Sequence, residues 1–322
     1  MTTSTAIAEQ PTVRTQASDD RGLGRGIVLA LTASLSNQVG AATGALAFPS
    51  IGPVGVVSIR QLITAAVLVP VGRPRFRSMT WAQWWPVLCL GVVFGVMNTS
   101  VYVTIDRLGL GLAITLEFLG PLAIAILASC RAIDLLCGLL AAVGVVVLVN
   151  PSPSTDLLGV GIGLISGVAW GCYVLLNRKI GQRMPGLQGA GAASLVSAIM
   201  WVPIAIYWFT AHPPALWAIG FAVICALLSS VVPFSIDLIA LRRVPANVFS
   251  TLQSMHPVWA AIVGLVMLHQ VLSVQEWLGI ALVVLSNVLV TTASMRRTRA
   301  GATGHSARTT ATCSATGSRL AT

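Results

Sequence analysis

Long apolar runs recur along almost the whole chain, and they limit the folds that it can adopt. Ten runs are long enough, at about 20 residues each, to cross the hydrocarbon core of a bilayer as helices. They fall near residues 26–46, 51–71, 84–104, 110–129, 134–150, 157–177, 188–208, 216–236, 246–266 and 272–294. Because the runs are continuously apolar and do not alternate with a period of two, they predict an all-α membrane protein and not a β-barrel.

The composition agrees with lipid as the main solvent of this chain. Hydrophobic residues make up 56% of the sequence and charged residues only 9%, and the mean hydropathy is +0.87. The formal net charge of +10 would suggest a nucleic-acid partner in a soluble protein. Here the cations lie between apolar runs and not on one amphipathic face, so we expect a lipid bilayer around the chain and no nucleic-acid partner.

The two ends of the chain have a different character. Residues 1–25 are polar and lack the apolar core and the cleavage site of a secretory signal, so we interpret them as a disordered cytoplasmic leader. Residues 295–322 are rich in Ala, Thr, Ser, Gly and Arg without any apolar period, which predicts a disordered basic cytoplasmic tail lying on anionic lipid. The six cysteines have no metal-binding or redox spacing, and we expect neither a metal nor a cofactor.

The positions of the cations predict how the helices are oriented. Seventeen of the nineteen Lys and Arg residues lie before the first run or after the second, fourth, sixth, eighth and tenth runs. The segments on the other side carry a single cation, Arg107, and Arg60 lies inside the second run. Because Lys and Arg are retained in the cytoplasm, both termini are predicted to be cytoplasmic in a multi-pass protein of the bacterial inner membrane.

The two halves of the chain repeat one pattern. An offset of 136 residues aligns Arg107 with Arg243 and Pro121 with Pro257, and it equates the first five apolar runs with the last five. The predicted repeats span residues 26–150 and 157–294. Since five is an odd number, the copies must cross the membrane in opposite senses, which predicts a substrate site between the halves near the midplane and alternating access.

Two charged residues are predicted to lie inside the spans at similar depth. Arg60 lies in the second run and Glu117 in the fourth, whereas the equivalent positions of the second repeat hold the neutral residues Val196 and Gln253. Because both charges are absent from that repeat, we predict that they pair. The pair is either a static link between two helices, or a site in which Glu117 faces a cavity, binds a substrate amine or a proton, and is tuned by Arg60.

Two further titratable residues are candidates for the site. Asp237, near the cytoplasmic end of the eighth run, is within reach of Arg242 and Arg243, so an interfacial ion pair is an alternative to a role in the site. His256, in the ninth run, is either a group that titrates near neutral pH or a buried histidine that donates to a carbonyl.

Other polar and aromatic residues lie within the apolar runs. They are Asn37, Gln38, Asn98, Tyr102, Trp170, Tyr173, Asn177 and Gln253. Any one of them can join two helices, but together they are typical of a cavity lining. Pro121 and Pro257, each expected in mid-helix four residues after a polar position, either free backbone carbonyls near the site or bend the helix for packing.

The sequence contains no visible catalytic machinery. It has no HExxH or GxSxG motif, no clustered carboxylates with ligand spacing and no cofactor loop, so a transporter is favoured over a membrane-embedded enzyme. A channel is disfavoured because the polar candidates do not form charged or carbonyl rings.

Three segments carry a resemblance to a known family. Residues 108–134 (with LEFLGP at 116–121), 165–182 and 231–268 resemble the drug/metabolite transporter superfamily, its EamA family, and within it the Rht-type threonine/homoserine exporters. The resemblance implies a ten-helix EamA fold and export of small hydrophilic amino acids driven by the proton gradient. It also implies functional roles for Glu117 and for Asp237, where close relatives would show Glu.

The chain departs from the family pattern in the ninth run and the turn after it. His256-Pro257 stands where a Glu-Pro pair is expected, and His269-Gln270 stands in a turn where an acidic residue is expected. Because the candidate cavity residues include aromatic side chains, an exporter of drugs or other small metabolites is the alternative function.

Overall fold

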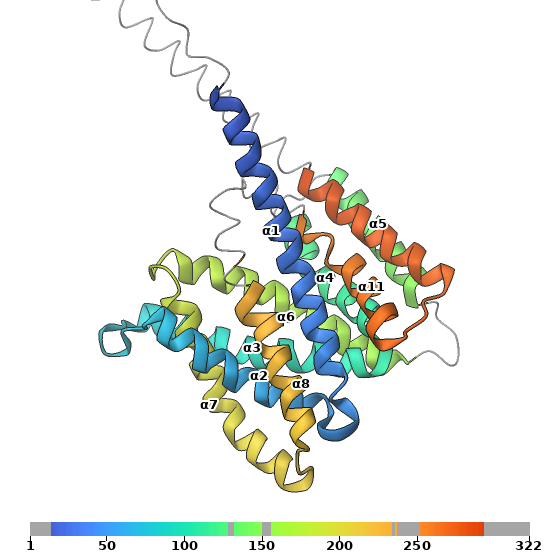
Figure 1. Cartoon of the computed structure of the whole chain (residues 1–322). Helices are drawn as coiled ribbons and strands as arrows, with labels where there is room; N and C mark the ends of the chain where they lie inside the picture. Colours follow the sequence, from blue (N-terminus) through green and yellow to red (C-terminus); the bar gives the residue numbers. More distant parts are fainter. Residues whose placement is uncertain (1–13, 128–131, 150–155, 234–235, 237–251, 293–322) are drawn as a thin grey trace, which may run out of the picture.

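The computed structural model describes residues 14–127, 132–149, 156–233, 236 and 252–292, and its regular elements are all helical (Figure 1). They are α1 (Arg14–Ala45), α2 (Phe48–Gly72), η1 (Phe76–Ser78), α3 (Trp81–Leu108), α4 (Leu110–Leu127), α5 (Ala132–Val149), α6 (Leu157–Gly181), α7 (Gln188–Ala211), α8 (Leu216–Ala226), the π-helical η2 (Leu227–Val231), α11 (His256–Leu268) and a last helix, Val274–Thr292. The prediction of an all-helical protein is confirmed for these residues.

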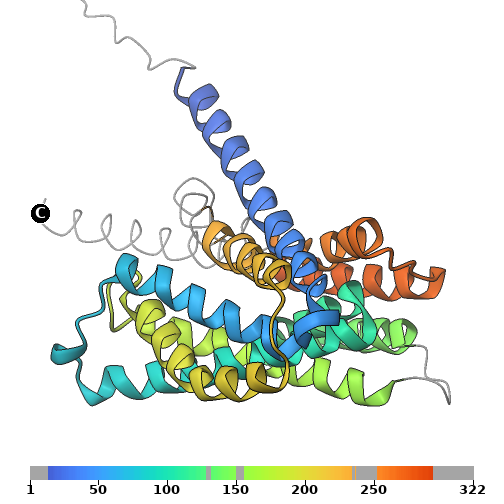
Figure 2. The ribbon, with the colours of Figure 1, turned by 60° about the horizontal axis from the view of Figure 1, so that its bottom comes forward.

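The first helix begins earlier than the sequence predicted. α1 starts at Arg14 and not at residue 26, so residues 14–25 of the expected leader are helical. Extending a helix that an apolar run has already nucleated adds one hydrogen bond per residue, whereas starting a new helix is unfavourable. The first turns of α1 project beyond the other described helices (Figures 1 and 2). The predictions for residues 1–13 and for the tail 295–322 lie outside the described residues.

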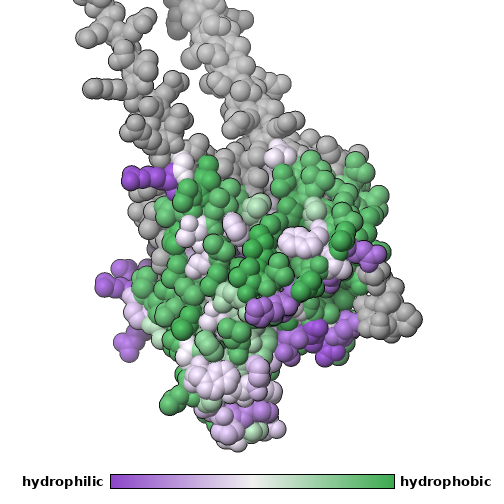
Figure 3. All heavy atoms as spheres, turned by 45° about the vertical axis from the view of Figure 1, so that its right-hand side comes forward, coloured by the Kyte–Doolittle hydropathy of each residue, from purple (hydrophilic) through white to green (hydrophobic). Residues whose placement is uncertain are grey.

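Five of the described helices are long and apolar enough to cross a membrane. They are α2, α3, α6, α7 and Val274–Thr292. Four shorter apolar helices accompany them, at Leu110–Ile124, Leu135–Val149, Leu216–Val231 and His256–Leu268. These helices explain why the surface in Figure 3 is covered mostly by apolar side chains.

The outward face of α5 illustrates what surrounds such helices. Leu135, Leu139 and Val146 are 60%, 62% and 59% exposed. A soluble monomer rarely exposes an apolar stripe of this extent to water. The stripe therefore fits contact with lipid.

The helices pack in a limited set of pairs. The most extensive contacts join α2 to α7 and α3 to α6. α4 packs against α6 and α11, and α1 packs against α8, η2 and α11. In addition, α3 contacts α7, and α2 contacts α8. α5 lies beside Val274–Thr292 (Figure 1), where Ser286 donates to the carbonyl of Cys137 at 2.6 Å.

The contact between α4 and α6 depends on glycine. A Cβ atom added at Gly120 would overlap the carbonyl oxygen of Gly167. A Cβ atom at Gly167 would in turn lie 2.9 Å from the carbonyl oxygen of Leu116. The two backbones meet without intervening side chains, as in other membrane helix pairs with small residues at the interface.

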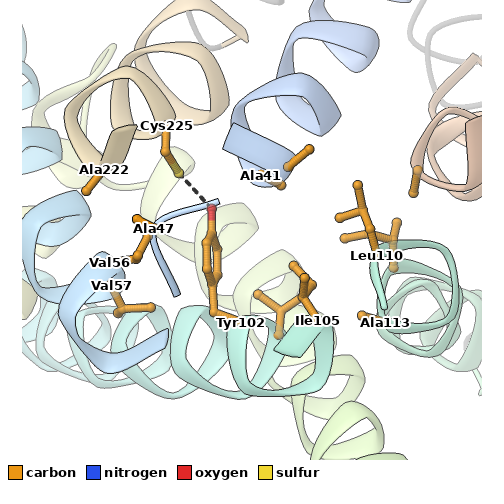
Figure 4. Close-up of a cluster of buried hydrophobic side chains, with 14 of the residues drawn as sticks. Ala41, Ala47, Val56, Val57, Tyr102, Ile105, Leu110, Ala113, Ala222 and Cys225 are labelled. Atoms are coloured by element: carbon orange, nitrogen blue, oxygen red, sulfur yellow. Dashed lines mark hydrogen bonds between the residues drawn. The ribbon is translucent and has the colours of Figure 1, made fainter. Parts of the chain in front are cut away.

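The largest described core cluster surrounds Tyr102 (Figure 4). The tyrosine is 1% exposed, and its hydroxyl lies 2.9 Å from the Sγ atom of Cys225 on α8. Val56 and Val57 of α2 belong to the same cluster. A buried tyrosine is accommodated here because its polar tip has a hydrogen-bond partner.

The turns predicted to lie on the cation-poor side contact one another. Arg107 at the end of α3 donates to both carboxylate oxygens of Asp156, at 2.7 and 2.8 Å. Asp156 also caps α6 by accepting from the amide of Gly159 at 3.0 Å. The Arg107 guanidinium is the main cause, and this capping bond the second, that holds the pKa of the Asp156 carboxyl below its usual range.

A second tie on this side involves the turn after α11. The side-chain oxygen of Gln270 accepts from the amide of Leu110, at the start of α4, at 2.8 Å. A carboxylate at this turn would accept the same bond, so the glutamine keeps the contact without the charge. On the same predicted side, Trp208 donates to the carbonyl of Ile51 at 2.7 Å.

Two of the cation-rich segments also contact each other. Gln83, at the start of α3, donates to the carbonyl of Arg183 at 3.0 Å, and Arg183 donates to the carbonyl of Ala82. These bonds join two of the cation-rich segments, the one before α3 and the one after α6.

The second half departs from the predicted runs at two places. The expected helix 216–236 changes from α8 to the π-helical η2 at Leu227. The expected helix 246–266 is interrupted by a turn at 254–255, and α11 starts after it at His256. Pro257 therefore lies in the first turn of α11 and not in mid-helix, because a residue without an N–H is accommodated where no intrahelical bond is lost. Residues 246–251 lie outside the described part of the chain.

The close approach of α4 and α6 gives a stability test. Gly120→Ala is expected to lower the free energy of unfolding by about 1–3 kcal/mol or more, because its methyl group has no room beside Gly167. Gly161→Ala, on the same helix pair but with open space around the added atom, should stabilise by up to about 1 kcal/mol. Thermal unfolding of both purified variants in detergent measures the difference. Equal midpoints would contradict the assigned contact.

Candidate functional site

One cavity lies between the helices and has a volume of about 290 Å³. Its wall is formed by residues of α1, α2, α3, α4, α6, α7, η2 and α11, together with Pro233 and Gln253. α5 and Val274–Thr292 contribute no residue to this wall. The volume lies near the lower end of the range for ligand pockets, roughly 300–1,000 Å³, and suits a small solute.

Most of the residues that the sequence singled out line this cavity. They are Asn37, Gln38, Arg60, Asn98, Tyr102, Glu117, Trp170, Tyr173, Asn177, Gln253 and His256. The twelfth, Asp237, lies outside the described residues. These side chains come from six separate helices and the short helical segment before α11, and the fold brings them together around one space. Their role in binding stays a prediction.

Arg60 is held against the π-helical segment of the second half. Its Nε atom donates to Ser230 Oγ at 3.3 Å, and one Nη atom donates to the carbonyl of Ser229 at 3.4 Å. The guanidinium lies 5.3 Å from the centre of the Tyr102 ring, within the range of a cation–π contact. π-Helical turns interrupt the regular helical ladder and are frequent at functional sites.

Glu117 has a different partner. Ser166 on α6 donates its hydroxyl to the carboxyl of Glu117 at 2.9 Å. The neighbouring Phe118 packs edge-on against Trp170, with ring centres 4.9 Å apart. The carboxyl is thus positioned by the α4–α6 contact.

The predicted ion pair between Arg60 and Glu117 is not formed. Among the described residues, the ion pair within 4.0 Å joins Arg107 to Asp156. Arg60 is bonded to η2 and Glu117 to α6, so each charge finds hydrogen bonds on a different helix. Similar depth along two helices does not ensure contact, because the direction of each side chain around its helix axis also matters.

His256 bridges two glutamines. Its Nδ1 atom lies 2.9 Å from Nε2 of Gln38 on α1, and its Nε2 atom lies 2.9 Å from Oε1 of Gln253. The amide N–H of Gln38 donates to Nδ1, so the imidazole proton is assigned to Nε2, which donates to Gln253. The ring also stacks on Phe118 at 6.0 Å. The histidine therefore bonds to side-chain amides, and not to a backbone carbonyl as one interpretation expected.

The two prolines differ in their positions along their helices. Pro121 lies inside α4, four residues after Glu117, as predicted. Pro257 follows His256 in the first turn of α11. The prediction of a mid-helix kink at both positions is therefore wrong for Pro257.

The sequence analysis missed several small polar residues of the wall. They are Ser34, Gln61, Thr64, Ser194, Ser229 and Ser230. A serine or threonine in an apolar run gives a weak signal, because its hydroxyl can bond to its own helix. Thr104 shows this behaviour: its hydroxyl donates to the carbonyl of Ser100 at 2.8 Å.

Three buried polar atoms of the wall have no hydrogen-bond partner among the residues that the structure describes. They are Ser34 Oγ, Gln38 Oε1 and Asn177 Nδ2. Buried polar groups in native proteins are nearly always bonded, so these atoms mark places where a bound molecule or water would be favoured. Within the described ranges, no group of three or more His, Cys, Asp or Glu residues has the arrangement of a metal site.

Comparisons with known proteins agree on one kind of relative. Residues 157–292 match the EamA-like transporter family. The threonine/homoserine exporter RhtA of Escherichia coli K12 is 33% identical over 270 residues, which cover 81% of this chain and 90% of the relative. RhtA of Salmonella typhimurium LT2 is 32% identical over the same lengths.

Two more distant similarities add to this. The uncharacterized transporter YwfM of Bacillus subtilis is 26% identical over 154 residues, which cover 47% of this chain and 50% of the relative. A solved crystal structure has a TM-score of 0.55 and 19% identity, and covers 85% of this chain and 99% of its own. The latter is a likeness of fold alone.

The bond between Ser166 and Glu117 gives a matched pair of variants. Ser166→Ala leaves a buried carboxyl without this donor and is expected to lower the free energy of unfolding by about 1–3 kcal/mol. Ser197→Ala removes a buried hydroxyl that has no partner in the described ranges, so the free energy of unfolding should stay equal or rise. Thermal unfolding in detergent measures both. A larger loss of stability for Ser197→Ala than for Ser166→Ala would refute the bond between Ser166 and Glu117.

Proposed function

We propose that this chain, which belongs to the EamA-like transporter family, is a secondary active exporter of small amino acids of the threonine and homoserine type in the bacterial inner membrane. The observation that carries the proposal is the small cavity, lined among the described residues by one acid, one cation and several uncharged polar side chains, in a chain similar to exporters of those amino acids. Transport, and not catalysis, is the proposed activity.

The proposed architecture is ten transmembrane helices in two inverted repeats, residues 26–150 and 157–294. Helix packing supports it. If α1, α2, α3 and α4 are exchanged with α6, α7, α8 and α11, the contact α3–α6 becomes α8–α1, and α4–α6 becomes α11–α1. Likewise α3–α7 becomes α8–α2, whereas α2–α7 and α4–α11 map onto themselves. These five contacts fit a twofold relation between the halves, whereas α2–α3 and α3–α4 have no exchanged equivalent among the main contacts of the described helices.

Both termini are proposed to be cytoplasmic. The excess of Lys and Arg on one set of connecting segments supports this orientation. The bonds of Arg107 to Asp156 and of Gln83 to Arg183 support the division of the segments into two sets. The basic tail 295–322 is then available to anionic lipid on the cytoplasmic face.

The proposed mechanism is alternating access with proton coupling. The cavity wall takes residues from both proposed repeats, so rocking one repeat against the other would open the cavity to either side in turn. Glu117 is the proposed coupling residue, because a carboxyl at membrane depth can exchange a proton and a substrate ammonium. Ser166 would hold it in place during the exchange.

The cavity favours a small solute over a large drug. Its volume of about 290 Å³ is limited on one side by Trp170 and Tyr173. Polar atoms without a partner among the described residues, such as Asn177 Nδ2, favour a ligand with several hydrogen-bonding groups. An amino acid with a hydroxyl side chain has these properties.

Expression in a bacterial strain sensitive to excess threonine or homoserine tests the proposed substrate. We expect resistance to rise and efflux of radiolabelled threonine to increase relative to the empty vector. Membrane insertion is checked by immunoblotting of the membrane fraction. An inserted protein that gives neither resistance nor efflux contradicts the amino-acid proposal.

Substitution of the buried acid tests the coupling. Glu117→Gln is expected to reduce efflux by about ten-fold or more, since the amide cannot exchange a proton, and a protonophore should reduce efflux by the original protein. Glu276→Gln is the matched control, because Glu276 caps the last helix through the amide of Ser273, outside the cavity. If Glu117→Gln exports as well as Glu276→Gln at equal expression, Glu117 is not the coupling residue.

A further inference from the structure

Arg60 is a cation inside a membrane-spanning helix without an anionic partner among the described residues. A guanidinium has five N–H donors. Two of them reach η2, at 3.3 and 3.4 Å, which is beyond the usual 2.7–3.2 Å for N–H···O, and the guanidinium also interacts with Tyr102. A charge at membrane depth is unfavourable unless it is paired or wetted, so binding of an anion would stabilise this arginine.

The surroundings of Arg60 favour a ligand over a protein group as that anion. Arg60 and Glu117 line the same cavity but are bonded to different helices, η2 and α6. Ser34 and Gln38 line it too, and Ser34 Oγ and Gln38 Oε1 have no hydrogen-bond partner within the described part of the chain. In the described wall, one cation, one acid and unpartnered polar atoms surround a space of about 290 Å³, which matches a small molecule that carries both charges.

We propose that Arg60 binds the carboxylate of the substrate while Glu117 binds its ammonium group, so that the cavity selects zwitterionic amino acids with a free carboxylate. The guanidinium fork suits two parallel bonds to a carboxylate. The assignment rests on the proposed function and deepens it. It excludes amides, esters, lactones and purely cationic compounds as good ligands, because each would leave Arg60 without its anion.

The internal repeat adds to this assignment. The position equivalent to Arg60 is Val196, which does not line the cavity. A second carboxylate anchor is therefore absent from the described wall, and the site is polarised from Arg60 toward Glu117. A single ligand orientation follows, with the carboxylate toward η2 and the ammonium toward α6.

A purely structural role for Arg60 makes a different prediction. If the guanidinium only fastens α2 to η2 and to the ring of Tyr102, its loss would weaken all ligands to the same extent. If it binds a carboxylate, its loss would weaken only ligands that carry one. The ratio of two affinities therefore separates the roles, because a general loss of stability cancels in it.

The experiment compares L-threonine with L-threoninamide, and L-homoserine with its lactone, on the purified full-length protein in detergent. Thermal stabilisation is titrated against each compound to give an apparent Kd. The amino acids are expected to bind at least about ten-fold more tightly than the neutralised analogues, which corresponds to loss of a charged hydrogen bond. Arg60→Gln should bring the ratio to about one, and Arg60→Lys should restore part of it.

Arg107→Gln is the matched control. It removes an arginine from an exposed ion pair outside the cavity and should keep the ratio of the original protein. If the original protein binds the amide as well as the acid, or if Arg60→Gln keeps the ratio, the assignment is overturned. Should Arg60→Gln fail to fold, the affinity ratio of acid to amide is measured for Arg60→Lys and for the original protein. A ratio of about one in the original protein, or an unchanged ratio in Arg60→Lys, then overturns the assignment.

The design also separates this inference from the proposed function. If threonine and homoserine do not bind, the other standard L-amino acids are tested against their amides. A different amino acid that binds with the same preference shows that the threonine proposal is wrong and that the Arg60 assignment holds. Binding of amides, esters or cationic drugs alone overturns the Arg60 assignment.

Discussion

Water is excluded from the interior of a bilayer, so each polar group of a spanning chain needs a partner within the protein or in a wetted cavity. The backbone meets this constraint by forming helices. The side chains meet it in local arrangements: Tyr102 bonds to Cys225, and His256 lies between two glutamine amides. The cavity is lined by polar groups that have not all found a hydrogen-bond partner among the described residues.

Helix packing determines where those groups meet. Gly120 and Gly167 let α4 and α6 approach at backbone distance, and the approach brings Ser166 to Glu117. The π-helical turn of η2 presents the Ser229 carbonyl and the Ser230 hydroxyl to Arg60. The two charges of the cavity are therefore positioned by separate helix contacts, and α5 with Val274–Thr292 packs outside them.

Much of this arrangement could be predicted from residue types. The apolar runs predicted the helices, and polar or aromatic residues within the runs, such as Asn98 and Trp170, do line the cavity. Contacts could not be predicted in the same way. The pairing of Arg60 with Glu117 is predicted from their similar depth and their joint absence from the second repeat, and neither observation fixes the direction of a side chain around its helix axis. Pro257 was placed in mid-helix because hydropathy does not distinguish the interior of a helix from its first turn.

Arg60 and Glu117 are bonded to different helices, and this arrangement has a consequence for the effect of the membrane potential. When Glu117 is ionised, these two charges of the cavity cancel, and a zwitterionic ligand adds no net charge. A membrane potential is worth about 2.3 kcal/mol per elementary charge per 100 mV, but it does no net work on a neutral load. For the proposed exporter, voltage would then act on these two groups and the proposed ligand only through a step that changes protonation, and an acid such as Glu117 is where that change would occur.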